Sequence, residues 1–152
     1  MRLADGILNG ALAGAAGTTG LNAATYLDMA ARGRSSSSGP EDTVEKLAEK
    51  ASVRIPGDEE SRGNRVSGLG ALNGIASGVV VGSALGALRW AGCRPGVLGA
   101  GLIATLGTMA LTDGVMSLVG VTDPRSWSTT AWASDVVPHL AYGFVTAVAL
   151  DR

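Results

Sequence analysis

The chain has 152 residues, with 12 basic and 13 acidic side chains and a formal net charge of −1. There is no excess of positive charge to draw it to nucleic acid, and an aromatic content of 4% leaves few rings on which bases could stack. A single cysteine, Cys93, and a single histidine, His139, exclude an internal disulfide framework and disfavour a cysteine- or histidine-based metal cluster. Neither a metal nor another cofactor is therefore predicted.

Four stretches of the sequence have few or no charged side chains. Because a helix rises about 1.5 Å per residue, roughly 20 apolar residues cross the hydrocarbon core of a bilayer. The predicted membrane spans are 6–28, 66–88, 96–118 and 131–150. The alternative is a soluble bundle with long buried helices, but the uncharged run 66–88 leaves no polar face for water. The sequence thus predicts an all-α protein, a glycine-rich four-helix transmembrane bundle forming one membrane domain over residues 1–152.

The first span has a second interpretation, because it lies at the start of the chain. A cleaved signal peptide has a basic start and a compact apolar core. The opening residues "MRLAD" combine a basic with an acidic side chain, and Asn9 and several glycines interrupt the apolar run. These features favour a retained membrane helix.

Between the first two spans lies a charged loop, 29–65. Its part from residue 32 onward holds seven basic and seven acidic side chains, 14 of the 25 in the chain. Within it, "SSSSGPEDTVEKLAEKASV" predicts one short amphipathic helix, capped by Ser38 with Glu41 three residues later. Asp42 and Lys46 are expected to pair on its outer face, and its apolar face to pack on the loop-side ends of the bundle. The following "IPGDEESRGNR" is predicted to be a turn-rich return to the second span.

Glycines recur at every fourth position of the second span. Each would cost a helix in water about 1 kcal/mol relative to alanine. In lipid, helices associate through close backbone contact, which small residues permit. The predicted helix-packing residues are Gly70, Gly74, Gly78, Gly82 and Gly86, with Gly6, Gly10 and Gly14 in the first span. We expect the two grooved helices to pack on each other or against a common neighbour, although a general richness in small residues is the alternative.

The orientation follows from the distribution of basic residues. An even number of spans places both termini on one side, and more lysines and arginines lie on the side of loop 29–65. This distribution predicts a multi-pass protein of the cell (inner) membrane, with the loop in the cytoplasm and both termini outside. Aromatic side chains near the span ends fit an interfacial belt; they are Tyr26, Trp90, Trp127 and Trp132.

The stretch that most resembles a reactive or ion-binding site is "SDVVPHLAYG" in the fourth span. Asp135 and His139 are four residues apart and so lie on one helix face. Asp113 in the third span is a candidate to face them across the bundle, giving a possible ion or proton site. The plainer alternative places Asp135 at headgroup level near Trp132, with His139 merely hydrogen-bonded to it.

Three stretches carry a resemblance. "LADGILNGALAGAAGTTGLNAATYLDMAARGR", "PEDTVEKLAEKASVRIPG" and "TDPRSWSTTAWASDVVPHLAYG" resemble small integral membrane proteins of actinobacteria that are distantly similar to the YagU-type inner-membrane proteins. The resemblance covers most of the chain and implies an integral inner-membrane protein with no assigned activity. It supplies no catalytic residues.

The functional expectation is therefore a structural or accessory membrane protein with no enzyme chemistry. Its expected partners are the lipid bilayer and either further copies of itself or a larger membrane complex. The alternative is a small transporter or a proton- or ion-conducting protein that uses Asp113, Asp135 and His139.

Overall fold

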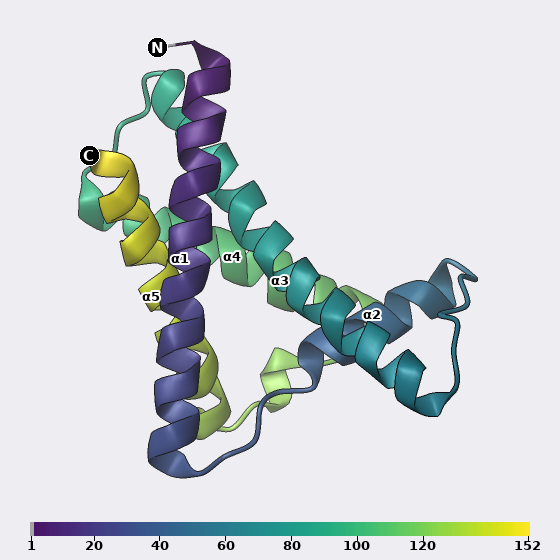
Figure 1. Cartoon of the computed structure of the whole chain (residues 1–152). Coiled ribbons are helices and arrows are strands. Elements are labelled where there is room, and N and C mark those ends of the chain that lie inside the picture. The colour runs from purple at the N-terminus through teal and green to yellow at the C-terminus, as the bar shows by residue number, and fades with distance from the viewer. Residues whose placement is uncertain (1) are drawn as a thin grey trace.

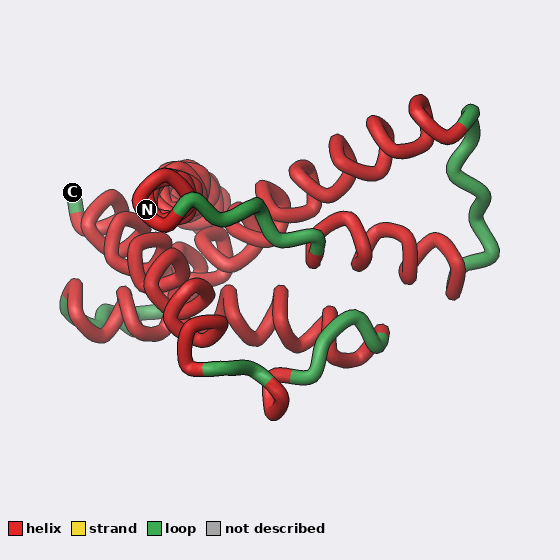
Figure 2. Tube along the Cα trace, turned by 90° about the horizontal axis from the view of Figure 1, so that it is seen from below, coloured by secondary structure: helices red, strands yellow, loops and turns green. Residues whose placement is uncertain are grey.

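The computed structural model describes residues 2–152, and these residues form helices and connecting loops without any strand. Figures 1 and 2 show the arrangement from two directions. The elements are α1 (Leu3–Arg32), α2 (Gly39–Lys50), α3 (Glu59–Trp90), α4 (Val97–Val119), the short 3₁₀ helix η1 (Pro124–Ser126) and α5 (Thr129–Asp151). The all-helical expectation is thus confirmed for the described residues.

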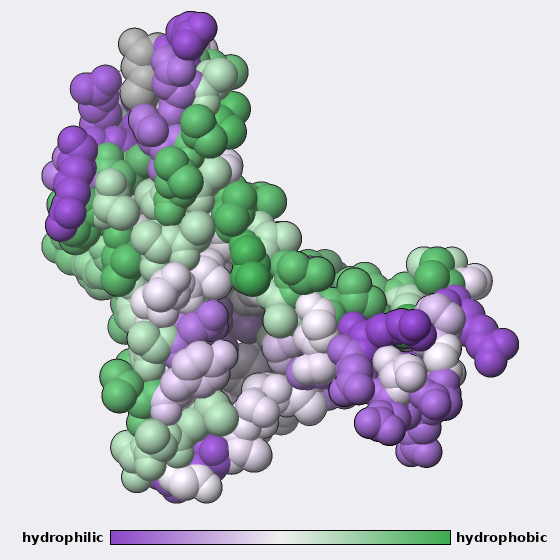
Figure 3. Space-filling model, viewed as in Figure 1, coloured by the Kyte–Doolittle hydropathy of each residue, from purple (hydrophilic) through white to green (hydrophobic). Residues whose placement is uncertain are grey.

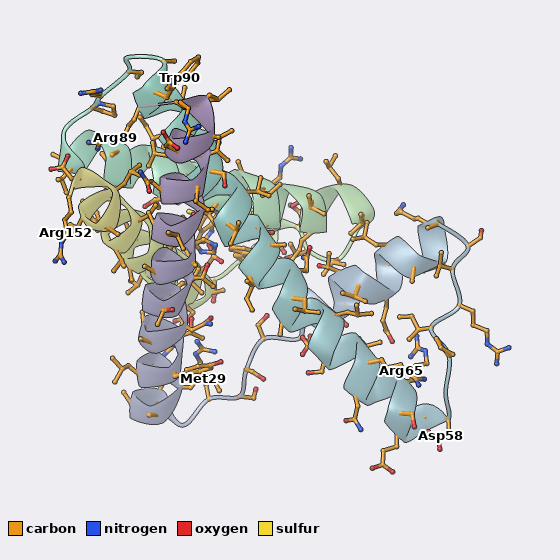
Figure 4. All side chains as sticks on the ribbon, turned by 45° about the horizontal axis from the view of Figure 1, so that its top comes forward. Met29, Asp58, Arg65, Arg89, Trp90 and Arg152 are labelled. Carbon is orange, nitrogen blue, oxygen red and sulfur yellow. The ribbon has the colours of Figure 1, made fainter. Side chains whose placement is uncertain are left out.

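Helix α1 packs against both α3 and α5 and runs antiparallel to them (Figure 1). Helix α4 packs against α5, whereas α2 and the first part of α3 extend to one side (Figure 2). Arg89, Trp90 and Arg152 lie at the end of the molecule where the chain starts and finishes, and Met29 lies at the other end (Figure 4). At the first end Arg89 forms an ion pair of 3.2 Å with Asp151, which joins the last turns of α3 and α5.

Three helices, α3, α4 and α5, are long and apolar enough to cross a membrane. Much of their apolar surface is unburied, and in α4 only 17% of the most apolar window lies inside the fold. Leu98, Leu102 and Leu106 recur at every fourth position of that helix and are all exposed. These features are compatible with a multi-pass membrane protein. Helix α1 is also long enough, but it contains no 18-residue stretch as apolar as those of the other three.

The start of α3 differs from the sequence expectation. The segment "IPGDEESRGNR" was predicted to be a turn-rich return, but α3 already begins at Glu59. The reason is a helix cap, because the carboxylate of Asp58 accepts a hydrogen bond of 2.9 Å from the backbone N–H of Ser61. Glu59 and Glu60 then place negative charge in the first turn, where the helix dipole favours it.

The details of α2 also differ from expectation, although a helix forms in the predicted place. Ser38 does not cap the helix with its side chain; its hydroxyl donates a hydrogen bond of 2.8 Å to Asp42 instead. Lys46 pairs with Glu49 at 2.9 Å and not with Asp42, which Ser38 already engages. Helix α2 packs against α3 and α4, and Thr43 is buried there.

Candidate functional site

The first candidate feature is the interface between α1 and α3, where two backbones approach closely. A Cβ atom added to Gly82 would lie 2.6 Å from the Cα of Gly14, and one added to Gly86 would lie 2.9 Å from the Cα of Gly10. The relation is reciprocal, since a Cβ on Gly10 would lie 3.0 Å from the Cα of Gly86. Backbone cannot move aside as the end of a flexible side chain can, so a methyl group at these positions would force the two helices apart.

The other predicted glycines of α3 have different surroundings. A Cβ on Gly70 would meet Pro40 of α2 at 3.2 Å, so this position faces the loop helix and not α1. Gly74 has the same four-residue spacing, yet outside the surrounding turns of α3 no described atom lies within 4 Å of its would-be Cβ. The difference arises because α1 and α3 cross at an angle and diverge toward the start of α3 (Figure 1).

A tyrosine from α5 closes the junction of three helices. Tyr142 is fully buried, and its hydroxyl donates a hydrogen bond of 2.7 Å to the carbonyl oxygen of Gly78 in α3. Its ring also lies against α1, because a Cβ on Gly17 would approach the ring carbon Cδ2 to 2.9 Å. Sequence reasoning missed Tyr142; an aromatic side chain deep inside a small-residue span is the signal that points to it.

Helices α4 and α5 meet through a further close contact that was not predicted. A Cβ on Gly143 would lie 2.9 Å from the backbone nitrogen of Thr105. The buried hydroxyl of Thr105 lies 2.8 Å from the carbonyl oxygen of Gly101 on its own helix and 3.3 Å from that of His139 on α5. This approach places the following turn of α4 directly beside His139.

The second candidate feature is a cluster, formed by Asp113, Asp135 and His139, that the structure brings together between α4 and α5. Asp113 is 8% exposed, and its carboxyl lies close to Asp135 and His139 on α5. Nδ1 of His139 lies 2.8 Å from the backbone carbonyl oxygen of Asp135 and 3.4 Å from its Oδ1. Nε2 lies 3.4 Å from the hydroxyl of Thr112. The predicted juxtaposition of the two helices at this point is thus present in the structure.

Two carboxylate oxygens in this cluster lack a donor. Oδ1 of Asp113 and Oδ2 of Asp135 are buried, and no hydrogen-bond partner for either occurs among the described residues. Buried charged oxygens are costly unless a proton, a cation or a donor satisfies them. Within residues 2–152, no three His, Cys, Asp or Glu side chains are arranged to hold a metal ion.

No protein-family model, curated protein or solved structure matches the chain.

Proposed function

We propose that the chain is an integral protein of the cell membrane with a structural or accessory role, in which α1 forms a fourth membrane helix beside α3, α4 and α5. In this role the bundle acts without catalysis, as part of a homo-oligomer or of a larger membrane complex. The bilayer is its surrounding medium.

The position of α1 supports its place in the membrane. It lies alongside α3 and α5, so a bilayer around those helices surrounds α1 as well (Figure 1). Residues 6–27 carry no charged side chain. Leu8 and Leu12 are 61% and 64% exposed, which is unfavourable in water and favourable in lipid. The surface in Figure 3 agrees, since hydrophilic residues gather near the termini and over α2, while hydrophobic residues follow the outer side of α3.

The observation that carries the proposal is the reciprocal contact of Gly10 and Gly14 with Gly82 and Gly86. In lipid, burying an apolar side chain between helices gains little, because hydrocarbon tails are equally apolar. Dispersion contacts between closely approaching backbones then supply the attraction. An interface in which glycines on both helices leave no side chain between the two backbones is the arrangement that these dispersion contacts favour.

The native cysteine allows a direct test of topology. Cys93 is exposed in the turn between α3 and α4. In a Cys93→Ser background, two separate variants each carry one thiol. Arg2→Cys places it before the start of α1, and Ser36→Cys places it after the end of α1. With a membrane-impermeant maleimide on intact cells, we expect only one of these two thiols to react; unmodified Cys93 should react on the same side as position 2.

Lysed cells provide the control, because both thiols should then react equally. Labelling of both positions, or of neither, in intact cells would show that α1 does not cross the membrane. Release of the full-length chain by alkaline carbonate would contradict membrane integration altogether. A mass measurement in mild detergent tests the assembly, and a lone monomer there would contradict the proposed oligomer or complex.

The buried carboxyl pair supports a second candidate function, the movement of protons or small cations across the membrane. Ionisable side chains at membrane depth are costly and mark ion pathways in many membrane proteins. In liposomes containing the purified chain, Asp135→Asn and His139→Ala should then alter pH-dependent flux while the helical fold is retained. If these variants changed only the state of assembly, the accessory role would stand alone.

A further inference from the structure

We propose that the cavity between α1, α3 and α5 beside Arg89 is a binding site for one membrane phospholipid whose headgroup carries a primary amine. The inference goes beyond the accessory role and rests on the proposed membrane location of these three helices. In this site the ion pair of Arg89 and Asp151 binds the headgroup in addition to joining α3 to α5.

The cavity lies at the end of the molecule where the chain starts and finishes, the end at which Figure 4 labels Arg89. Its volume is about 290 Å³, and residues of all three helices line it. Asn9 of α1 and Arg89 of α3 supply polar groups, whereas Leu12 of α1 and Leu150 of α5 supply apolar surface. Such a lining fits a ligand with one polar and one apolar end, and the volume suits a headgroup with the start of its acyl chains.

The order of these groups along the helices matches a bilayer. Arg89 directly follows the uncharged run 66–88 and precedes Trp90, an exposed aromatic residue of the kind found at headgroup level. On α1, Leu12 lies about one turn deeper than Asn9, and its side chain is exposed on the outer side of the helix. A headgroup at Arg89 therefore directs its acyl chains along Leu12 into the hydrocarbon.

Unused hydrogen-bond donors favour a phosphate as the group that Arg89 binds. The side chain of Arg89 is only 19% exposed, and its Nη1 and Nη2 both lie 3.2 Å from the same oxygen, Oδ1 of Asp151. Nε and the remaining N–H groups of the guanidinium have no acceptor among the described residues. Asn9, which lines the same cavity, adds an amide donor. The phosphate diester of a lipid accepts such hydrogen bonds and carries the opposite charge to arginine.

The carboxylate beside Arg89 favours a headgroup that also carries a cation. Asp151 neutralises the arginine and would repel a ligand that brings only negative charge. Its Oδ2 accepts no hydrogen bond from the described residues, and its side chain is 49% exposed, so an ammonium group can reach it. In an ethanolamine phospholipid the phosphate is attached to the glycerol and the amine extends beyond it. The less exposed Arg89 and the more exposed Asp151 follow the same order.

Binding of defined lipids to the purified full chain tests the site. The chain is stripped of lipid in mild detergent, and native mass spectrometry then measures binding of ethanolamine, choline and glycerol phospholipids with identical acyl chains. We expect one ethanolamine phospholipid to bind about tenfold more tightly than either of the others. The choline headgroup has no N–H to donate to Asp151, and the glycerol headgroup has no cation. Glycerophosphoethanolamine, which lacks acyl chains, should not bind.

Variants assign the two charged contacts. Arg89→Gln should weaken binding of the ethanolamine phospholipid about tenfold, and Asp151→Asn should remove its advantage over the choline phospholipid. Asn9→Ala keeps the ion pair and should weaken binding without changing the order of the lipids. Arg94→Gln is the matched control, because Arg94 is an exposed arginine in the turn 91–96 that does not line the cavity.

Equal binding of the three phospholipids, or a preference for the glycerol headgroup, would overturn the inference even if a variant failed to fold. Unchanged binding in an Arg89→Gln protein that keeps its helical circular dichroism would also overturn it. Binding of glycerophosphoethanolamine as tight as that of the lipid would assign the cavity to soluble phosphate esters instead. A chain that resists alkaline carbonate but binds no ethanolamine phospholipid would refute this site alone, whereas release by carbonate would refute the membrane location and the site together.

Discussion

The phenol of Tyr142 donates a 2.7 Å hydrogen bond to the carbonyl oxygen of Gly78, and in doing so joins α5 to α3 behind α1. Gly78 lacks the side chain that would obstruct this approach, since its would-be Cβ would lie 3.2 Å from the tyrosine ring. One residue pair thus combines a close backbone approach with a buried polar contact.

Replacing this tyrosine tests the junction. Tyr142→Phe keeps the ring and removes the donor, so we expect a loss of about 1 kcal/mol in the free energy of unfolding. The measurement is denaturation in mild detergent micelles, followed by circular dichroism. Tyr26→Phe is the matched control, because Tyr26 is 62% exposed, and it should leave stability unchanged. Equal stability of the two variants would show that the hydrogen bond contributes nothing.

The glycines of α3 provide a matched pair of substitutions on one helix. Gly82→Ala places a methyl group 2.6 Å from the Cα of Gly14 and forces the backbones apart, at an expected cost of about 1–3 kcal/mol. Gly74→Ala meets no described atom within 4 Å, and the better helix propensity of alanine should leave stability equal or slightly higher. Detergent denaturation of both variants measures the difference. Similar losses for the two would remove the packing explanation.

The helices could be predicted from the sequence because membrane spanning is a property of length and charge along one segment. The structure places α3, α4 and α5 over the last three predicted spans, and a long helix over the first. The start of α3 was missed because a single carboxylate, that of Asp58, extends the helix into a charged segment. Local chemistry of this kind competes with the turn tendency of glycine and proline, and composition alone does not decide the outcome.

The contacts between helices were less accessible to sequence reasoning. Regular spacing placed Gly74 with its neighbours, but two crossing helices touch over a limited length, so this residue lies beyond the contact. Tyr142 and Gly78 are 64 residues apart, and nothing in either segment specifies the other. The juxtaposition of Asp113 with Asp135 was accessible, because an ionisable side chain in an apolar span needs a partner and few were available.

The contact between α4 and α5 leads to a further prediction. Gly143→Ala would bring a methyl group to 2.9 Å from the backbone nitrogen of Thr105, so we expect it to separate the helices and cost about 1–3 kcal/mol. Gly114→Ala on α4 is the control, since no described atom lies within 4 Å of its would-be Cβ. Thermal unfolding in nanodiscs measures both. If Gly143→Ala proved as stable as its control, α4 and α5 would not approach this closely.

The last prediction concerns pH and the start of α3. Hydrogen bonds from the Ser61 hydroxyl and backbone N–H hold the pKa of Asp58 below its ordinary value of 3.8. A lowered pKa in the folded state means that the carboxylate stabilises the cap above pH 3.8, and that this stabilisation is lost as the pH falls through the lower folded-state value. Amide hydrogen exchange over residues 59–65, divided by intrinsic rates, should therefore show protection falling from about pH 4 downward. Asp58→Asn keeps a capping oxygen that does not titrate, so its protection should fall less. Identical pH profiles for the two proteins would show that Glu59 and Glu60, and not the cap, control the start of this helix.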